Sequence, residues 1–486
     1  MTVRPNKSRR DTIRLLLSGG ATVLLAACGA SVTGQAPSSS ATGTSTPDNA
    51  ATTTNSAVST KVTGSTSTSA AATAAGAAAV ASTSTSASSF VSIAGRATVQ
   101  FWSRFPWLAD VARLYNAGPG DQNKVALQYT NPGDMVTKLT TALAGGTPPD
   151  LVTLDVVQCP RFTVAGGFAD ITSAYNQLSY KSELVPAMLN QGQAAGKQYL
   201  IPFESDTSAL LWNKALLQEA GLDAEKGPQT WGDFRTYAQK LTHPPGRYGT
   251  WLVINGGGSY TFTFMPWAWM NGGDLLNTDG TKCILNSPQT AEALDLWANM
   301  NVKDRSTPDE NRAGKAFDTQ KTFVAGNLGL LLGGNANVVS LAKGAPTLDF
   351  ATGLFPPKDA GGTSASEAGG DNTGIPTGTK TRDQAWQVIQ YLLSAPVQVE
   401  FLAKLGSIPV RSSMGDNAYF KANPRMAVFA KTLAVARTPY TPKFNELFKT
   451  ADSPLIVRLD EAVRGLRSVS EALSLAEQEI NGLLGK

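Results

Sequence analysis

Histidine and cysteine are scarce in this sequence. Its 486 residues include one histidine, His243, and three cysteines. His243 is followed by Pro244, Pro245 and Gly246, which mark a loop, and nothing nearby suggests a nucleophile, so a Ser–His–acid triad is not expected. Cys28, Cys159 and Cys283 do not show the spacing of a disulfide framework or a zinc site. A bridge between Cys159 and Cys283 would demand close, specific geometry, and we expect them to be separate buried thiols.

The usual catalytic motifs and a strong charge bias are also absent. The sequence has no G-x-S-x-G elbow, no H-E-x-x-H helix and no phosphate-binding G-x-x-x-x-G-K-[ST] loop, so we expect neither a cofactor nor a metal. Its 41 Lys and Arg face 37 Asp and Glu, a formal net charge of +4. No basic stripe interleaved with aromatics is present, which argues against a nucleic-acid partner. A glycosidase that uses two distant carboxylates stays open.

The N-terminus has the pattern of an export signal. A segment rich in basic residues, 7–14, precedes an apolar run, 15–27, that is too short to span a membrane. Residues 25–28 read LAAC and resemble the bacterial lipobox, which implies that Cys28 receives a diacylglyceryl group and becomes the mature N-terminus. The alternative is a plain signal peptide with an incidental cysteine. We therefore predict a signal peptide over 1–28 and an extracytoplasmic protein held at the membrane through Cys28.

Two features of the N-terminal region add detail to this prediction. Residues 8–10 (SRR) resemble the start of a twin-arginine signal, so the choice between the Sec and twin-arginine routes stays open. Residues 29–94 are nearly all Ala, Ser, Thr and Gly and have too few large apolar side chains to offset the entropy of ordering. We expect this stretch to be a disordered tether.

The remaining chain predicts an α/β fold with at least two lobes, because one hydrophobic core rarely exceeds about 300 residues. Apolar, β-branched runs at 97–102, 124–129 and 151–154 predict strands, and helical spacing predicts helices over 109–115 and 135–143. This alternation predicts a parallel sheet with crossover helices. In such sheets ligands bind beyond the carboxyl ends of the strands, which here carry Arg104 and Asp155.

Short segments along the globular part resemble the family 1 extracellular solute-binding proteins, relatives of the maltose-binding protein. Each match is short, but their shared order covers most of 97–486. In chain order they are AGGTPPDLV (144–152), GKQYLIPFE (196–204), LLWNK (210–214), AGL (220–222), QTWGDF (229–234), FVAGN (323–327), GGDNTGIP (369–376) and SIPVR (407–411). Trp212 stands where the family has tyrosine, which puts a ligand role for that position in doubt.

The resemblance implies a two-lobed periplasmic-binding-protein fold of type II, with a ligand cleft between two α/β lobes. It predicts an N-terminal lobe of 95–204 and 323–374 and a C-terminal lobe of 205–322 and 375–486. Ligand that contacts both lobes only in the closed form would shift the population toward closure. The expected partners are a small solute and the membrane subunits of an ABC permease, and the protein is expected to be a monomer without enzymatic activity.

Sugar recognition needs aromatic platforms for ring faces and polar groups for hydroxyls. Aromatic candidates for contact with the ligand cluster in two regions, although aromatic residues are more often core. The resemblance favours either Trp267 or Trp269 as a platform, not both. The aromatic candidates are Trp102, Trp251, Trp267 and Trp269, with Phe105, Trp107 and Tyr260 nearby.

The polar candidates each have a competing structural role. Asp155 could cap a helix or turn, Asn335 could cap a turn, Glu204 could form a hinge salt bridge, and Arg411 could form a structural ion pair. Asp371 follows Gly369 and Gly370, where small residues allow the backbone to approach a ligand. The polar candidates are Arg104, Asp155, Glu204, Asp206, Asn335, Asp371 and Arg411.

The sequence therefore predicts a lipid-anchored receptor that binds a sugar or oligosaccharide. Three alternatives stay open: a receptor for a polyamine or a glycerol phosphate ester, a carbohydrate hydrolase that uses two carboxylates, and a surface adhesin displayed on the tether.

Overall fold

A computed structural model describes residues 95–252, 259–315 and 317–486. Most of its strands belong to one nine-stranded sheet of the described residues, in the order β2-β1-β3-β10-β6-β8-β7, with β9 added to β6 and β11 to β10. The remaining strands, β4 and β5, pair with each other. The strands are β1 (Ala97–Trp102), β2 (Val125–Thr130), β3 (Leu151–Asp155), β4 (Gln193–Ala194), β5 (Lys197–Gln198), β6 (Leu200–Asn213), β7 (Tyr248–Thr250), β8 (Leu328–Gly334), β9 (Phe350–Gly353), β10 (Ser366–Gly374) and β11 (Ala436–Arg437).

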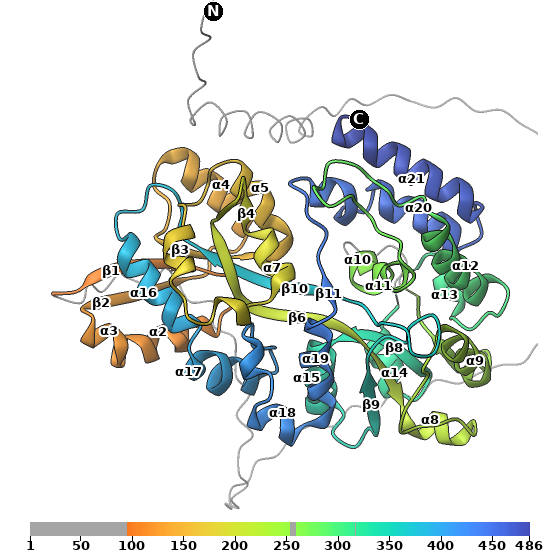
Figure 1. Ribbon diagram of the computed structural model, residues 1–486. Helices are drawn as coiled ribbons and strands as arrows, with labels where there is room; N and C mark the ends of the chain where they lie inside the picture. Colours follow the sequence, from red (N-terminus) through yellow and green to blue (C-terminus); the bar gives the residue numbers. More distant parts are fainter. Residues whose placement is uncertain (1–94, 253–258, 316) are drawn as a thin grey trace, which may run out of the picture. The chain divides into compact units, whose positions relative to one another are not determined.

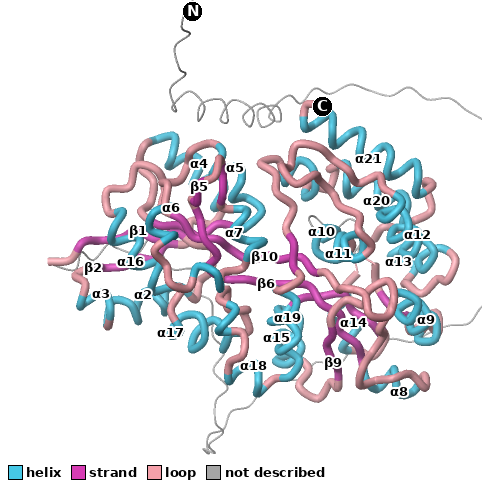
Figure 2. The backbone as a smooth tube through the Cα atoms, viewed as in Figure 1, coloured by secondary structure: helices cyan, strands magenta, loops and turns pink. Residues whose placement is uncertain are grey.

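Helices cover the sheet at both of its ends (Figures 1 and 2). Around β1–β3 lie α2 (Leu108–Ala117), α3 (Pro119–Gln122), α4 (Met135–Gly145), α5 (Cys159–Val164), α6 (Thr172–Asn176), α7 (Pro186–Gln191), α16 (Arg382–Leu392) and α17 (Ala395–Val397). The others are α8 (Lys214–Glu219), α9 (Trp231–Leu241), α10 (Ser259–Thr263), α11 (Met265–Met270), α12 (Pro288–Val302), α13 (Asp309–Arg312), α14 (Thr319–Val324), α15 (Asn335–Gly344), α18 (Ala418–Ala422), α19 (Pro424–Leu433), α20 (Pro454–Val463) and α21 (Val469–Leu484).

The first part of the chain confirms the predicted α/β pattern. β1 runs parallel to both β2 and β3, and α2 and α4 lie between these strands in sequence. The side chain of Asp134 caps the start of α4, and Gly146 ends the helix with a φ of 71°. That left-handed conformation favours glycine, so the Gly145-Gly146 pair is the stop signal that the sequence predicted.

β6 connects two separately packed parts of the sheet. Its first residues, Leu200–Thr207, pair with β10, whereas Ser208–Asn213 pair with β8 and β9. Leu210 and Trp212 face one hydrophobic cluster while Ala209 and Leu211 face another, because successive strand residues point to opposite faces. Both faces of this part of the sheet are therefore buried under helices.

The buried residues form two lobes on either side of this crossover. The N lobe contains the clusters around Phe101 and Phe162, and the C lobe contains those around Trp267 and Phe323. Figure 1 shows β6 and β10 running from the elements of one lobe to those of the other. This arrangement agrees with the type II fold expected from the sequence.

Two segments pack in the opposite lobe from the one predicted for them. Phe323, Leu328 and Val338, predicted for the N-terminal lobe, pack in a cluster with Tyr248 of the C lobe. Conversely, Val388 and its neighbours on α16 pack with β1 and α2 in the N lobe, although they were predicted for the other lobe. The physical reason is that β8 extends the sheet beyond β6 and α14 and α15 pack on β8, whereas α16 returns to cover β1.

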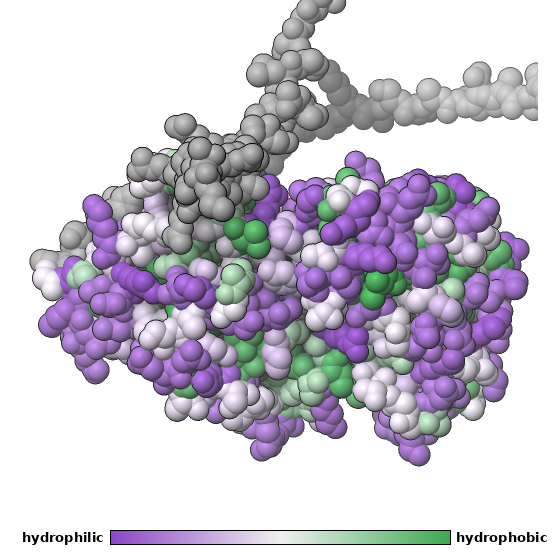
Figure 3. Space-filling view, turned by 45° about the horizontal axis from the view of Figure 1, so that its top comes forward, coloured by the Kyte–Doolittle hydropathy of each residue, from purple (hydrophilic) through white to green (hydrophobic). Residues whose placement is uncertain are grey.

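The predicted signal peptide, lipidation site and tether, residues 1–94, lie outside the described residues. Within the described ranges, no helix combines the length and apolarity that crossing a membrane requires. On the face shown in Figure 3, hydrophobic residues gather near the middle and most of the remaining surface is hydrophilic. Cys159 and Cys283 are separate buried thiols, as predicted.

Candidate functional site

The sheet brings Arg104, Asp155 and Asp371 together where strands of both directions meet. Arg104 follows β1 and Asp155 ends β3, and these parallel strands end at the same edge. β10 runs antiparallel to β3 and places Asp371 directly opposite Asp155. On its other edge β10 pairs with β6, and this pairing places Asp371 opposite Glu204. Residues from four strands, far apart in sequence, therefore converge at the crossover.

Arg104 is the central cation of this group. Its Nη2 donates to Asp371 Oδ1 at 2.6 Å, and its Nη1 lies 3.4 Å from Asp155 Oδ2. The Arg104 side chain is 43% exposed, whereas Asp371 is fully buried. Burial lowers the pKa of Arg104, but the negative charges of Asp371, Asp155 and Glu204 outweigh this and raise it. Arg104 therefore stays charged and is reachable from solvent along one side.

Glu204 and Asp206 extend the acidic group along β6. Asp206 lies opposite Gly369 of β10, and a Cβ added at Gly369 would overlap the Asp206 carboxylate. The sequence linked Gly369 and Gly370 to the approach of a ligand. In the structure these glycines make room for β6: Gly369 lies against the Asp206 carboxylate and Gly370 against the backbone of Glu204.

Burial perturbs the acids of this group in one direction. Burial, together with the negative charges of Asp206 and Asp371, raises the pKa of Glu204 to about 8. Burial and the charge of Asp155 raise the pKa of Asp206 to about 6. Burial also raises the pKa of Asp371 to about 6, in spite of the opposing charge of Arg104. At neutral pH Glu204 is thus mostly protonated and can donate a hydrogen bond, whereas the two aspartates are mostly ionised and accept.

Direct contacts join the two lobes beside this group. They connect residues 155–161 of the N lobe with the π-helical turn Asn445–Lys449 of the C lobe. Gln158 Nε2 donates to Asn445 Oδ1 at 2.7 Å, and the reverse amide pair is 3.4 Å long. Lys449 Nζ lies 3.8 Å from Asp155 Oδ2, and Arg161 Nη1 lies 3.8 Å from Glu446 Oε1. We call these three pairs the closure contacts.

Val157 supports the same junction by packing. It lies between Asp155 and Gln158 and contacts both the N-lobe cluster around Phe101 and the C-lobe cluster around Trp267. Asp155 accepts from the Val157 backbone N–H at 3.3 Å, which holds the turn that presents these residues. The capping role considered for Asp155 is therefore present together with its contacts to Arg104 and Lys449.

Trp269 lines two adjoining hollows of about 330 and 150 Å³. Its indole Nε1–H donates to Asp274 Oδ1 at 2.9 Å, and Arg437 lies 3.4 Å from the other oxygen of Asp274. The smaller hollow is also lined by Asn190 of the N lobe. Trp269 is only 4% exposed and belongs to the C-lobe cluster, so most of its indole is packed and a small part faces the hollows.

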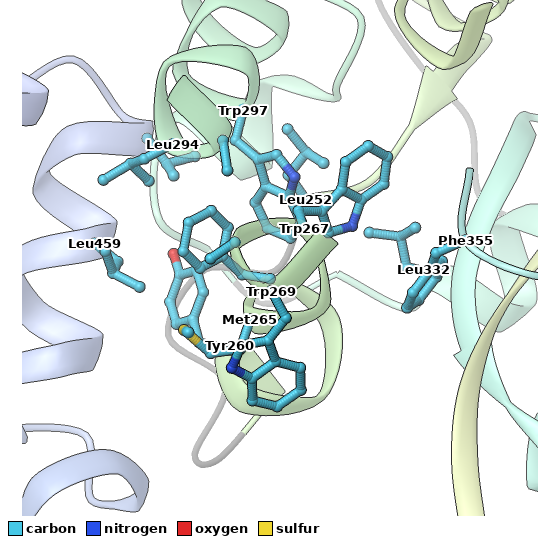
Figure 4. Close-up of a cluster of buried hydrophobic side chains, with 14 of the residues drawn as sticks. Leu252, Tyr260, Met265, Trp267, Trp269, Leu294, Trp297, Leu332, Phe355 and Leu459 are labelled. Atoms are coloured by element: carbon cyan, nitrogen blue, oxygen red, sulfur yellow. The ribbon is translucent and has the colours of Figure 1, made fainter. Parts of the chain in front are cut away.

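Trp267 has a different position, although it is only two residues away on α11. It is fully buried in the C-lobe cluster, among the rings of Trp231, Phe234, Trp297 and Phe355. In Figure 4 the indoles of Trp267 and Trp269 point in different directions from the helix. Residues two positions apart lie on nearly opposite sides of a helix, so only one of them faces the hollows.

Trp251 and Trp102 also lie mostly within packed regions. Trp251 is 7% exposed and stacks on Phe317 with ring centroids 4.5 Å apart. Trp102 is partly buried and packs against the N-lobe cluster around Phe162. Neither residue makes a described contact with Arg104 or its acidic partners, so the structure gives both a packing role.

The nearby aromatic candidates differ in burial. Phe105 and Trp107 are only partly buried against the N-lobe cluster, and the Arg104 guanidinium lies 5.1 Å from the centroid of the Phe105 ring. Phe105 and Trp107 stack on each other at 5.0 Å, Trp107 packs on Phe203, and Tyr260 is fully buried. Trp212 is buried in the C lobe, where Gly227 and Gly353 leave room for its ring. Trp212 therefore has a packing role in the core, at the position where the family has tyrosine.

Two polar candidates make structural contacts away from Arg104. Arg411 donates to Glu183 at 2.9 Å and lies 4.0 Å over the ring of Tyr180. Asn335 donates to the carbonyl of Gly406 at 2.9 Å and accepts weakly from the backbone of Thr207. The structural roles considered for these two residues are therefore present, and the structure does not bring them to the central group.

The sequence did not single out Gln158, Asn445 or Lys449. They carry the closure contacts, but none of them lies in a motif, and Asn445 and Lys449 belong to a short irregular turn. The one signal available was proximity to Asp155, which placed Gln158 near the expected binding edge.

Comparisons with known proteins identify a family for this arrangement. Residues 112–428 match the family described as bacterial extracellular solute-binding protein. Similar to this chain are the diacetylchitobiose binding protein DasA of Streptomyces coelicolor (23% identity, covering 78% of this chain and 87% of DasA) and the sn-glycerol-3-phosphate-binding periplasmic protein UgpB of Escherichia coli K12 (22%, 80% and 92%). The crystal structure of the cyclic alpha-maltosyl-1,6-maltose binding protein of Arthrobacter globiformis shares the fold, with a TM-score of 0.69 at 24% identity over 80% of this chain and 99% of that one.

Proposed function

Because the chain belongs to the bacterial extracellular solute-binding proteins, we propose that it captures a sugar or oligosaccharide between its lobes and delivers it unchanged to an ABC importer. The observation that carries this proposal is the set of closure contacts. They join the N lobe to the C lobe directly beside Arg104 and Asp155. A solute held by this group touches both lobes and stabilises the closed form relative to the open one.

The polar and aromatic groups at the crossover suit a carbohydrate. Arg104 and the ionised aspartates offer charge-assisted hydrogen bonds to hydroxyl groups, and Glu204 offers a donor while it is protonated. Trp269 lines the two hollows with the small part of its indole that is exposed, where a sugar ring can make an apolar contact. DasA and the Arthrobacter globiformis protein are named as sugar-binding proteins, which supports the same class of solute.

Isothermal titration calorimetry with maltose, maltotriose and N,N′-diacetylchitobiose tests the proposal. We expect saturable binding of at least one of them, and the sugar recovered afterwards should be chemically unchanged by chromatography. Hydrolysis of the bound sugar would favour the two-carboxylate hydrolase instead. If none binds, the sugar proposal is contradicted.

Replacing Asn445 by alanine is expected to weaken sugar binding about fivefold, since a neutral hydrogen bond contributes about 1 kcal/mol to stability. The variant loses the Gln158–Asn445 pair in the closed form only, which lowers the fraction of binding-competent protein. Calorimetry on the variant measures the change. Lys421→Ala removes an exposed ion pair with Asp416 on the C lobe and is the matched control. Equal affinities of the Asn445→Ala variant and the control would mean that the closure contacts do not form on binding.

We further propose that Cys28 carries the lipid that holds the protein at the outer face of the membrane. The LAAC segment and the basic and apolar residues before it support this proposal. A Cys28→Ser variant is expected to leave the membrane fraction of cells and appear in the soluble extracytoplasmic fraction. Retention of the variant in the membrane fraction to the same extent as the wild type would contradict the anchor.

A further inference from the structure

Carboxyl groups outnumber cations at the crossover. Asp155, Glu204, Asp206 and Asp371 meet through the register of β3, β10 and β6. Glu367 of β10 is also buried, and burial followed by the charges of Asp206 and Asp155 raises its pKa well above its usual value. These acids come from three adjacent strands, so the sheet itself holds them together.

The cations that pair with these acids already have carboxylate partners. Arg104 contacts both Asp371 and Asp155, and Lys449 contacts Asp155. Cys159 is another titratable neighbour, a buried thiol whose pKa is raised by burial and by the charges of Asp371 and Asp155. Neither cation is therefore an unpaired anchor for an anionic ligand.

One buried oxygen of the group points to a missing donor. Asp371 is fully buried, and its Oδ1 accepts from Arg104. The Thr153 hydroxyl lies close enough to lower the pKa of Asp371, but it also pairs with Ser103, and Oδ2 has no well-aligned hydrogen bond among the described residues. A buried carboxylate oxygen without a donor is costly, and a ligand hydroxyl or ammonium group would satisfy it. A phosphate ester, whose second pKa is about 6, is mostly a dianion at neutral pH and would be repelled by the ionised carboxylates instead.

We propose that the crossover acids select solutes that carry no negative charge, so that the site accepts neutral or amine-bearing sugars and rejects phosphate esters. This inference rests on the proposed sugar-binding function and narrows its ligand class. The relatives do not decide the matter, because one is named for diacetylchitobiose and another for sn-glycerol 3-phosphate at nearly the same identity.

The electrostatic argument holds at neutral pH. Asp206 and Asp371, whose pKa values are about 6, are mostly ionised there, while Glu204, with a pKa of about 8, is mostly protonated. Rising pH removes the proton of Glu204 and adds negative charge next to Asp206 and Asp371. Discrimination against anions should therefore grow between pH 6 and pH 9.

Calorimetry with probes that differ in charge tests the inference. The probes are chitobiose, with two amines, its neutral N,N′-diacetyl form, neutral maltose, the polyamine spermidine, and the anions maltose 1-phosphate and sn-glycerol 3-phosphate. We expect maltose or the diacetyl sugar to bind at least about tenfold more tightly than either phosphate, which corresponds to about 1.4 kcal/mol. A phosphate ester that binds as tightly as its neutral counterpart would overturn the inference.

The outcomes separate this inference from the proposed function. Binding of sn-glycerol 3-phosphate alone would overturn the charge selection and leave solute capture standing. Binding of spermidine without any sugar would uphold the charge selection and contradict the sugar proposal. If no probe binds, the result counts against both.

Asp206→Asn is the variant that addresses the mechanism. It removes one charge at nearly constant shape, so the preference for neutral over phosphorylated probes should narrow at least about threefold. Asp155→Asn serves the same purpose if the first variant does not fold, because asparagine can still cap the turn at Val157. Asp110→Asn on the exposed surface of α2 is the control and should leave the preference unchanged. If neither Asp206→Asn nor Asp155→Asn changes the preference for neutral over phosphorylated probes, the role of these acids is contradicted.

Discussion

Replacement of Arg104 by alanine is expected to lower the free energy of unfolding by about 2 kcal/mol at pH 8 and to abolish most ligand binding. The variant leaves the buried Asp371 carboxylate without its charged partner, which is the situation that makes a broken ion pair costly. The expected loss is smaller than that for a fully buried pair, because Arg104 is 43% exposed and water can partly replace it.

The pH dependence of this loss identifies its cause. The folded-state pKa of Asp371, about 6, lies above the value of about 3.9 for an unfolded aspartate, so its protonated form stabilises the fold below pH 4 and this contribution is lost as pH rises through 6. Without Arg104 the folded-state pKa rises further. The difference between variant and wild type should therefore shrink at pH 5, where a proton replaces the guanidinium.

Urea denaturation at pH 5 and pH 8 measures both effects. Arg113→Ala is the control, since it removes an exposed pair with Asp110 on α2 and is expected to change stability by less than about 0.5 kcal/mol. A loss of the same size at both pH values would show that Asp371 does not titrate as described.

Replacement of Trp267 by alanine is expected to destabilise the C lobe by about 3–5 kcal/mol, the usual cost of deleting a large aromatic side chain from a core. Trp267 is fully buried and contacts the rings of Trp231, Phe234, Trp297 and Phe355 (Figure 4). Its Nε1–H has no partner among the described residues, so the loss comes from packing alone.

Two further variants separate packing from ligand contact. Trp267→Phe should recover most of the stability, because it keeps an aromatic ring and removes the unpaired N–H. Trp269→Ala should lower stability and also weaken sugar binding, because Trp269 is 4% exposed in the C-lobe cluster and lines the two hollows as well. A loss of binding that Trp267→Phe does not show would assign the ligand contact to Trp269. Urea denaturation and calorimetry on all three variants check this. A Trp267→Ala protein as stable as the wild type would contradict the packing described here.

The strands of the N lobe were predictable because their signals are local. β1, β2 and β3 are apolar runs bounded by turns, and Gly146 marks the end of α4 by its backbone alone. Arg104 and Asp155 followed from these strands, since topology places the residues after parallel strands at one edge. The lobe bounds depended on long-range pairing instead. The return of α16 to cover β1 leaves no mark in the local sequence pattern.

The choice among the aromatic and amide residues required the structure. Trp267 and Trp269 have identical chemistry, lie on one short helix and are both buried, so only the direction of each side chain shows that Trp269 lines the hollows and Trp267 does not. Asn445 and Lys449 are ordinary polar residues of a surface turn, and they gain meaning only because the fold places them against Gln158 and Asp155. The roles of these residues depend on burial and long-range contacts, and both are properties of the folded chain.

The most direct test of closure on a solute is a distance between the lobes. Spin labels at the exposed positions Lys138→Cys on α4 and Gln478→Cys on α21, with Cys28→Ser, would report it, since Cys159 and Cys283 are buried. On addition of a sugar that binds by calorimetry, we predict a shorter and narrower distance distribution, and the Asn445→Ala variant should need more sugar to reach it. A distribution that does not change when that sugar saturates the protein would contradict capture by lobe closure.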